Sequence, residues 1–359
     1  MDYLKSVFTK KQNKWLIFSG AALFVFFVLL IIGVALSRSL DSQLAAQRWS
    51  KDKEYAQVSV FFSQLSGMTT DNIKELDFKI EQKLDEDSLV ADSPNGIRRI
   101  SAYSAVGKAD VASEKATKSL KAIGVGGDFF YFHPMELLSG SFFDEEDINK
   151  DRVVLDQDAA WELFGSNDIV GQIITVNGRS HVVAAVIKRD TGRLNRLAGN
   201  NESTIYLSYY SLITDMGELG LNSYEVLFQN PVRDYALNTV KDNITEDELR
   251  YEIKQNTGRF NWTKLILNVK NFGSRSMNSK TVVFPYWENM ARGLEDIMTP
   301  ICAVAVIMMA FVIVNLIVLL VRMYIKRTIH FKDFKDFAER RIEKYREVRN
   351  RKMEDGEYI

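Results

Sequence analysis

IMTPICAVAVIMMAFVIVNLIVLLVRMYI, residues 297–325, is apolar at almost every position. A helix rises about 1.5 Å per residue, so this stretch is long enough to cross a hydrocarbon core of about 30 Å and predicts a transmembrane helix. Charges of opposite sign flank it, namely Glu295 and Asp296 before it and Arg322, Lys326 and Arg327 at its end. Because basic residues stay preferentially on the cytoplasmic side, we expect the chain to cross inward here.

A second apolar run, residues 15–36, has no charged residue and follows four lysines in residues 1–14. It predicts a second transmembrane helix with a cytoplasmic N-terminus. The alternative is a cleaved signal peptide, because Ala35-Leu36-Ser37 resembles a small-x-small cleavage site. The run is longer than the usual apolar region of a signal peptide, about 7–15 residues, so we expect an uncleaved anchor.

Five segments follow from these two spans. We expect a cytoplasmic N-terminus (1–14), a transmembrane helix (15–36), an extracytoplasmic domain (37–296), a transmembrane helix (297–325) and a cytoplasmic amphipathic tail (326–359). The chain is therefore expected to be an integral protein of the cell membrane with both termini in the cytoplasm.

The charged residues are divided unevenly between the two sides of the membrane. Of 46 basic and 47 acidic residues, 16 basic and nine acidic ones belong to Arg322 and the two cytoplasmic segments. The remainder has a net charge of about −8, which is a poor match to nucleic acid, so no nucleic-acid partner is expected. The single cysteine, Cys302, lies in the second span. No intramolecular disulfide is possible, so the outer domain must depend on its own core.

The extracytoplasmic segment begins with a β-α-β pattern. Residues 57–63 (QVSVFFS) are β-branched and aromatic and predict a strand. Candidate N-caps at 69–71 precede apolar residues at helical spacing, which predicts a helix to about residue 85. Residues 97–106 return to an extended pattern, so an α+β layer with a helix packed on a sheet is expected.

Residues 123–213 predict shorter elements. Asn177-Gly178 between two alternating runs is typical of a hairpin, and Gly165 suits the end of a helix. The expected elements are strands at 152–155, 171–176, 180–187 and 204–207, a helix at 156–164 and a polar loop at 188–203.

The last part of the outer segment predicts two strands, at 222–228 and 265–269, and a helix starting within 231–240. Residues 287–296 then predict a helix that runs directly into the second span. An unbroken helix there could carry motion or tension between the outer domain and the membrane.

Four motifs, in order, give the middle of the chain a family resemblance. They are GVGGDFFYFHPMELLSGSFFDEED (124–147), VVLDQDAAWELFG (153–165), VGQIITVNG (170–178) and VVAAVI (182–187). Together they resemble the MacB-type periplasmic core domain, found in the MacB/FtsX class of ABC-transporter permeases. The resemblance implies an α+β extracytoplasmic domain between two transmembrane helices, with a mostly β subdomain inserted at about 123–213. Glycines such as Gly140 and Gly171 suit turns in this scaffold.

The chain departs from the family in two respects. Its permeases usually have two further spans after the cytoplasmic helix, whereas this sequence ends at that helix, so we expect a two-span form lacking the last two spans. It also has no G-x-x-x-x-G-K-[ST] sequence, so it is not expected to hydrolyse ATP by the P-loop route. Any nucleotide-driven motion must come from a separate ATPase.

Two sets of residues are candidates for contacts with other helices. Phe334, Phe337, Ile342 and Tyr345 recur at helical spacing in the tail and are candidates for docking a cytoplasmic partner. The alternative is a solvated helix whose basic residues lie near anionic lipid. Asn315, in the middle of the second span, is expected to hydrogen-bond a neighbouring helix, with an energy of about 0.6–2 kcal/mol.

No catalytic, cofactor or metal residues are expected. His133, His181 and His330 are far apart and form no zinc spacing, and no G-x-S-x-G motif is present. The acidic run at 144–147 has no partner at a catalytic spacing, so it predicts a solvated turn or a helix start.

The sequence therefore favours a membrane subunit of a MacB/FtsX-like ABC system, not an enzyme. Its expected partners are a separate ABC ATPase, membrane lipid, and either a multi-span permease or a second copy of itself. Movement of the outer domain is favoured over a substrate channel, because two largely apolar helices supply few groups to line a pore. The alternative is an extracytoplasmic binding or sensory module anchored at both ends.

Overall fold

The computed structural model describes residues 10–51, 54–91, 96–145, 147–217, 219–269 and 282–354. The chain divides into two compact units. The helical unit comprises the residues up to Gly33 and those from Ile301 onward, and the sheet unit runs from Val34 to Pro300. Each unit is described by itself below.

Two long helices make up the helical unit. They belong to α2 (Lys10–Ser37) and α11 (Tyr286–Glu354). By length and composition, the stretches Lys14–Ser37 and Tyr286–Ile325 are both able to cross a membrane.

The two helices contact each other within this unit. The ring centroids of Trp15 and Phe311 are 6.1 Å apart. One proline, Pro300, lies inside α11, and it is the last residue of the sheet unit. Proline has no amide hydrogen, so the helix loses one backbone hydrogen bond at this border.

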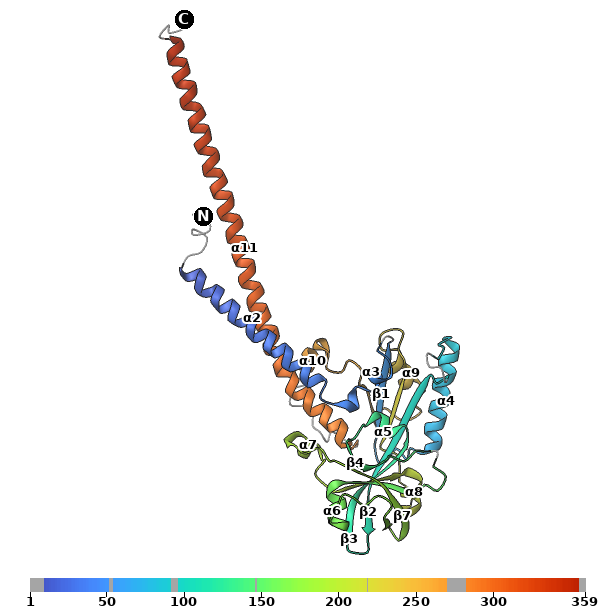
Figure 1. Cartoon of the computed structure of the whole chain (residues 1–359). Helices are drawn as coiled ribbons and strands as arrows, with labels where there is room; N and C mark the ends of the chain where they lie inside the picture. Colours follow the sequence, from blue (N-terminus) through green and yellow to red (C-terminus); the bar gives the residue numbers. More distant parts are fainter. Residues whose placement is uncertain are drawn as a thin grey trace. The chain divides into compact units, whose positions relative to one another are not determined.

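Ten strands of the described residues form one mixed sheet (Figure 1). The order across it is β10-β1-β9-β2-β3-β8-β5-β7-β4, and β6 pairs with β2 and β7. Only β3–β8 and β5–β7 are parallel among these described pairs. The strands are β1 (Tyr55–Phe62), β2 (Arg99–Ala112), β3 (Thr117–Gly127), β4 (Leu137–Gly140), β5 (Arg152–Asp156), β6 (Ile173–Val176), β7 (Arg179–Ile187), β8 (Thr204–Ser208), β9 (Ser223–Gln229) and β10 (Tyr251–Gln255).

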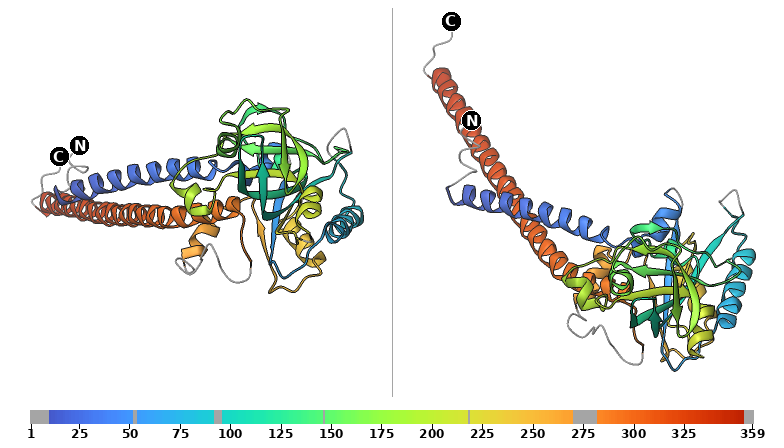
Figure 2. Two further views of the ribbon diagram at one scale, coloured as in Figure 1. Left: turned by 90° about the horizontal axis from the view of Figure 1, so that it is seen from below. Right: turned by 60° about the horizontal axis from the view of Figure 1, so that its bottom comes forward.

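Helices cover both faces of the sheet. One face packs against α4 (Thr70–Glu86), α6 (Gln157–Phe164), α8 (Tyr209–Met216) and α9 (Tyr235–Asn243). Figures 1 and 2 show α4 lying along one side of the sheet. The other face packs against α3 (Ala45–Trp49), α5 (Phe129–Phe132) and the first turn of α11. A short 3-10 turn, η1 (Asp41–Gln43), precedes α3.

β1 has a different chemistry on its two sides. Val58, Val60 and Phe62 belong to the apolar core that includes α4. The alternate residues Gln57 and Ser59 are also fully buried. Because successive side chains of a strand point to opposite faces, this polar pair lies on the face that α5 and α11 cover.

Local sequence signals fix several of these elements as expected. Thr69 and Asn72 form a capping box at the start of α4. Gly165 ends α6 in the left-handed conformation, with φ of 73°. Asn177 and Gly178 have φ of 47° and 88°, as a two-residue hairpin between β6 and β7 requires.

Two sequence-based predictions are wrong. Residues 265–269, predicted as a strand, fall mainly in α10 (Trp262–Asn268), because a short apolar run does not distinguish a strand from a helix. The loop predicted at 188–203 contains α7 (Arg193–Ala198).

The predicted β-rich insertion, residues 123–213, shares the sheet with its flanks. Residue 123 lies inside β3, which pairs with β2 on one side and β8 on the other. Residue 213 lies inside α8. The mixed α and β architecture is confirmed, whereas the division into two subdomains stays a prediction.

Gly140, at the end of β4, is expected to tolerate no side chain. Its φ is +78°, and a Cβ there would lie 2.0 Å from the backbone oxygen of Ala184. We expect Gly140→Ala to lower the free energy of unfolding by more than about 3 kcal/mol, because backbone strain adds to a backbone clash. At Gly171, with φ of +82° and nothing within 4 Å, the same change should cost only about 1–2 kcal/mol. Urea unfolding measures both, and equal losses would contradict this account.

Candidate functional site

A buried carboxylate, Glu225, lies in β9 and is 2% exposed. Its Oε1 accepts hydrogen bonds from Ser59 Oγ at 2.7 Å and Gln57 Nε2 at 3.3 Å, and its Oε2 is hydrogen-bonded to His133 Nε2. Burial alone raises the pKa of Glu225, but attraction to His133 and the hydrogen bonds outweigh it, so the pKa lies below its ordinary value. Glu225 is therefore held as a carboxylate.

His133 connects this carboxylate to α11. It directly follows α5 and is buried. Its ring centroid lies 4.4 Å from that of Trp287 and 4.6 Å from that of Phe129. Contacts therefore run from Glu225 in the sheet through His133 to the first turn of α11.

Arg259, in the segment after β10, binds two glutamates of α11. Its Nη1 and Nη2 donate to Glu288 at 2.6 and 2.8 Å, and its Nε donates to Glu295 at 2.7 Å. A longer bond of 3.4 Å reaches Gln43 in η1. Burial alone lowers the pKa of Arg259, but the two carboxylates outweigh it and raise the pKa above its ordinary value. The guanidinium thus stays charged although it is only 4% exposed.

Arg292 extends the network. Its Nε donates to Glu288 at 2.9 Å, and its Nη2 donates to Glu252 of β10 at 2.5 Å. Its guanidinium also lies 3.7 Å from the ring centroid of Phe284. We call Arg259, Glu288, Arg292, Glu295 and Glu252 the ionic cluster. Its three α11 members are spaced by four and three residues, so they share one face of the helix.

A hydrogen bond also joins α11 to α7. Asn289 Nδ2 lies 3.2 Å from the backbone oxygen of Ala198, the last residue of α7, and 3.2 Å from that of Phe284. The first turns of α11 are therefore held from several sides of the sheet unit.

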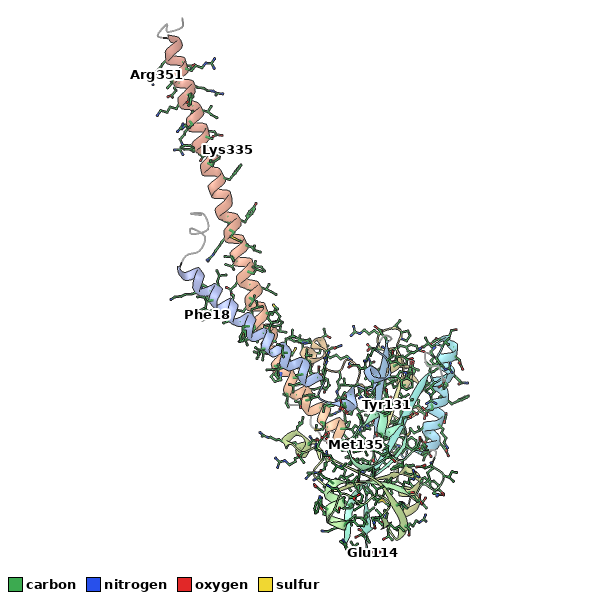
Figure 3. All side chains as sticks on the ribbon, in the orientation of Figure 1. Phe18, Glu114, Tyr131, Met135, Lys335 and Arg351 are labelled. Carbon is green, nitrogen blue, oxygen red and sulfur yellow. The ribbon has the colours of Figure 1, made fainter. Side chains whose placement is uncertain are left out.

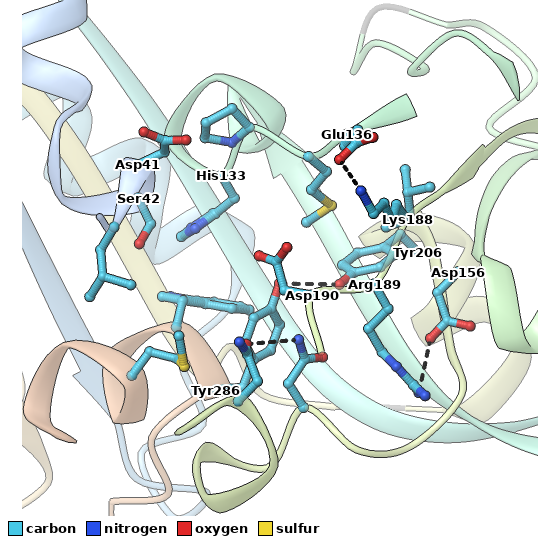
Figure 4. Close-up of a pocket in the computed structure, with 18 of the residues that line it drawn as sticks. Asp41, Ser42, His133, Glu136, Asp156, Lys188, Arg189, Asp190, Tyr206 and Tyr286 are labelled. Carbon is cyan, nitrogen blue, oxygen red and sulfur yellow. Dashed lines mark hydrogen bonds and ion pairs between the residues drawn. The ribbon is translucent and has the colours of Figure 1, made fainter. Parts of the chain in front are cut away.

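A cavity of about 270 Å³ adjoins this region, between η1, the end of β7 and the start of α11 (Figure 4). Lys188 and Glu136 form an ion pair of 2.8 Å on its wall. The hydroxyls of Tyr206 and Tyr286 lie 3.4 Å apart, and burial raises the pKa of Tyr206 well above its usual range. Asp41, His133, Arg189, Asp190 and Trp287 also line the cavity.

The residues singled out from the sequence lie in the helical unit. Asn315 is half-buried, and its Nδ2 donates to the backbone oxygen of Phe311 in its own helix at 2.9 Å. The four tail residues are between 55% and 73% exposed, and these are Phe334, Phe337, Ile342 and Tyr345. They fall within about 140° of one another around the helix. Figure 3 shows Lys335 and Arg351 on this part of α11.

The histidines do not come together as a site. His181 is buried, and its Nδ1 lies 3.1 Å from the backbone oxygen of Arg179, whereas the side chain of His330 is outside the described residues. Across the described part of the chain, no three His, Cys, Asp or Glu side chains are arranged to hold a metal ion. In the predicted acidic turn, Glu145 accepts a hydrogen bond of 2.6 Å from the Tyr103 hydroxyl.

Sequence reasoning missed the ionic cluster. A signal was present, because Glu288, Arg292 and Glu295 recur at helical spacing immediately before an apolar span. Glu225, which lies between Tyr224 and Val226 in β9, is a second such signal. The partner Arg259 has no local pattern that marks it.

These features define a domain of mixed α and β structure joined to two helices that are able to span a membrane. The chain belongs to the MacB-like periplasmic core domain family, whose model matches residues 20–256. This confirms the family resemblance found in the sequence.

Curated relatives match part of the chain. A macrolide export ATP-binding/permease protein MacB from Chromobacterium violaceum is 37% identical over 90 residues, which are 24% of this chain and 13% of that protein. A protein of the same name from Neisseria gonorrhoeae is 32% identical over 107 residues, or 29% of this chain and 16% of that protein. The matched stretch thus spans less than a fifth of each relative's length.

Solved structures also resemble the chain. The periplasmic region of MacB from Actinobacillus actinomycetemcomitans has a TM-score of 0.42 and 13% identity, covering 62% of this chain and 94% of that one. The extracellular domain of the noncanonic ABC-type transporter YknZ from Gram-positive bacteria has a TM-score of 0.36 and 19% identity, covering 55% and 99%.

Removing the central arginine of the ionic cluster should strongly destabilise the sheet unit. We expect Arg259→Ala to lower the free energy of unfolding by about 3–5 kcal/mol, because the buried Glu288 and Glu295 would lose the ion pairs that Arg259 makes with them. Lys118→Ala is the control, since its pair with Glu162 is exposed and 3.8 Å long, and should cost less than about 1 kcal/mol. Urea unfolding of the full chain in nanodiscs measures both, and a small loss for Arg259→Ala would contradict the proposed strength of the cluster.

The sheet unit should lose stability in acid through Glu225. Its pKa lies below the reference value of 4.5, so the contribution is present above that pH and is lost as the pH falls through the native pKa. We expect Glu225→Gln to be less stable by about 1–3 kcal/mol near neutral pH and to show a weaker pH dependence below about pH 4.5. Unfolding at a series of pH values tests this, and an unchanged slope in the variant would exclude Glu225 as the titrating group.

Proposed function

We propose that this chain is the membrane subunit of an ABC-transporter-type system and that it links the movement of its outer domain to a separate cytoplasmic ATPase. The observation that carries the proposal is the ionic cluster, which fastens the first turns of α11 to the sheet unit. α11 then continues as one helix to Glu354. A helix held by buried charges at one end is suited to transmit a pull or a rotation.

Mechanical linkage agrees better with these helices than a substrate channel does. The apolar stretches of α2 and α11 contain few polar groups, and Asn315 directs its amide nitrogen to its own backbone. A pore needs polar groups along its wall. We propose that the complete assembly contains a second copy of this chain or a multi-span permease, and that the remaining side of Asn315 meets a neighbouring helix there.

The tail residues Phe334, Phe337, Ile342 and Tyr345 are proposed to dock the ATPase. They are exposed and share one side of α11, with charged residues between them. An amphipathic helix that lies in a groove of its partner uses such a pattern. This placement requires both termini to be cytoplasmic and residues 37–296 to be extracytoplasmic, as the flanking charges indicate.

A second candidate function is an anchored binding or sensory module. The cavity of about 270 Å³ favours it, because Tyr286 and Trp287 of α11 belong to its wall. A ligand bound there would contact the base of α11 directly. This function requires a specific ligand and no ATPase, which separates it from the first proposal.

Substitution of the tail face tests the first proposal. We expect serine at Phe334, Phe337, Ile342 and Tyr345 to abolish co-purification of an ABC ATPase in mild detergent, because the apolar contact is removed. Alanine at Lys335 and Glu339, an exposed ion pair of 3.8 Å on the same helix, is the matched control and should retain the ATPase. Mass spectrometry identifies the partner.

Two outcomes would contradict the docking role. Retention of the ATPase by the serine variant would exclude this face as the contact. Recovery of the unmodified chain alone or as a homo-oligomer would favour the binding module, and ligand screening against the cavity would follow.

A further inference from the structure

α10 has its apolar side outward. Ile266 is 43% exposed and Leu267 65% exposed, and Val269, directly after the helix, is 46% exposed. The polar residues Lys264 and Asn268 are half-buried and therefore less exposed than these three apolar residues. A helix on the surface of a soluble protein shows the opposite arrangement, with its apolar stripe toward the core and its charged residues in water.

The orientation of α10 is fixed by one well-buried residue and by a lysine that is partly removed from water. Leu265 is 1% exposed and anchors the helix to the sheet unit. Lys264 is half-buried, and this burial lowers the pKa of its ammonium group. Rotating α10 about its own axis would expose Lys264 to water and bury Leu267 against the sheet unit. The structure instead has Leu267 exposed and Lys264 half-buried. The outward apolar side therefore requires a partner other than water.

The position of α10 indicates what that partner is. Arg259, three residues before α10, is hydrogen-bonded to Glu295 of α11 and to Gln43, which follows α2. Glu295 is two residues before Ile297, where the apolar stretch begins, a distance of about 3 Å along a helix. α10 thus starts beside the segment of α11 that leads into the apolar stretch.

We propose that α10 is an interfacial helix whose exposed face, Ile266, Leu267 and Val269, lies in the headgroup region of the outer membrane surface. The partner is lipid. Trp262 at its start suits this region, because tryptophan is enriched at the membrane-water boundary. Such a contact would fix the height of the sheet unit above the bilayer.

Fluorescence quenching in nanodiscs tests the proposal with the full chain. In a Cys302→Ala background, Leu267→Cys carries an environment-sensitive fluorophore, and the bilayer contains phosphatidylcholine and phosphatidylglycerol. The control is Leu249→Cys, because Leu249 is 76% exposed. It lies just before the first residue of β10, whereas Arg259 follows the last residue of that strand. Quenching is measured with doxyl-labelled lipid and, separately, with aqueous iodide.

We expect doxyl lipid to quench the label at 267 several-fold more strongly than the label at 249, and iodide to show the reverse order. Ile266→Cys provides a second position on the same face and should follow 267. Equal iodide quenching at 267 and 249 would overturn the proposal. Protection of 267 from both quenchers would also overturn it, because a protein, such as a second copy of the chain, would then cover the face.

Discussion

The pairing of Arg259 with Glu288 and Glu295 is the constraint on which the base of α11 depends. A guanidinium that is almost fully removed from water needs counter-charges in good geometry, and here both come from one helix. Rotating that helix by a single residue would turn both carboxylates by about 100°. Apolar packing alone would tolerate a small shift of α11 along its axis. Two directed ion pairs instead specify one position of Glu288 and Glu295 relative to Arg259. The attachment is therefore selective in direction as well as strong.

The two faces of the sheet differ in how far they bury polar side chains. The face under α4 buries mostly apolar strand residues such as Val58 and Val226, and its buried Tyr224 donates a hydrogen bond of 2.5 Å to Asp77 of α4. The face under α5 and α11 buries Gln57, Ser59 and Glu225 in hydrogen bonds. Buried polar groups stabilise less than apolar ones, but a hydrogen-bonded network admits few alternative arrangements. The hydrogen bonds of Glu225 therefore help to orient the elements on the face where α11 attaches.

How much of the structure the sequence predicts depends on the range of the interactions. The hairpin at Asn177-Gly178, the cap of α4 and the end of α6 at Gly165 are set by neighbouring residues, and each is found. Residues 265–269 are predicted as a strand, because a short apolar run does not distinguish a strand from a helix, and they fall mainly in α10. The ionic cluster joins positions up to 43 residues apart, from Glu252 to Glu295, so no local pattern pairs Arg259 with its glutamates.

Pro300 has a consequence for the kinds of bilayer that suit this protein. A proline withholds one backbone donor from α11, and bending a helix costs least where a hydrogen bond is already missing. Thr299 Oγ1 donates to the backbone oxygen of Glu295 at 2.7 Å, a type of contact that often accompanies a bend in a helix. An apolar helix adjusts to a thinner or thicker hydrocarbon layer chiefly by tilting. A change of tilt taken up at Pro300 would follow the lipid composition while Glu288 and Glu295 keep their places around Arg259.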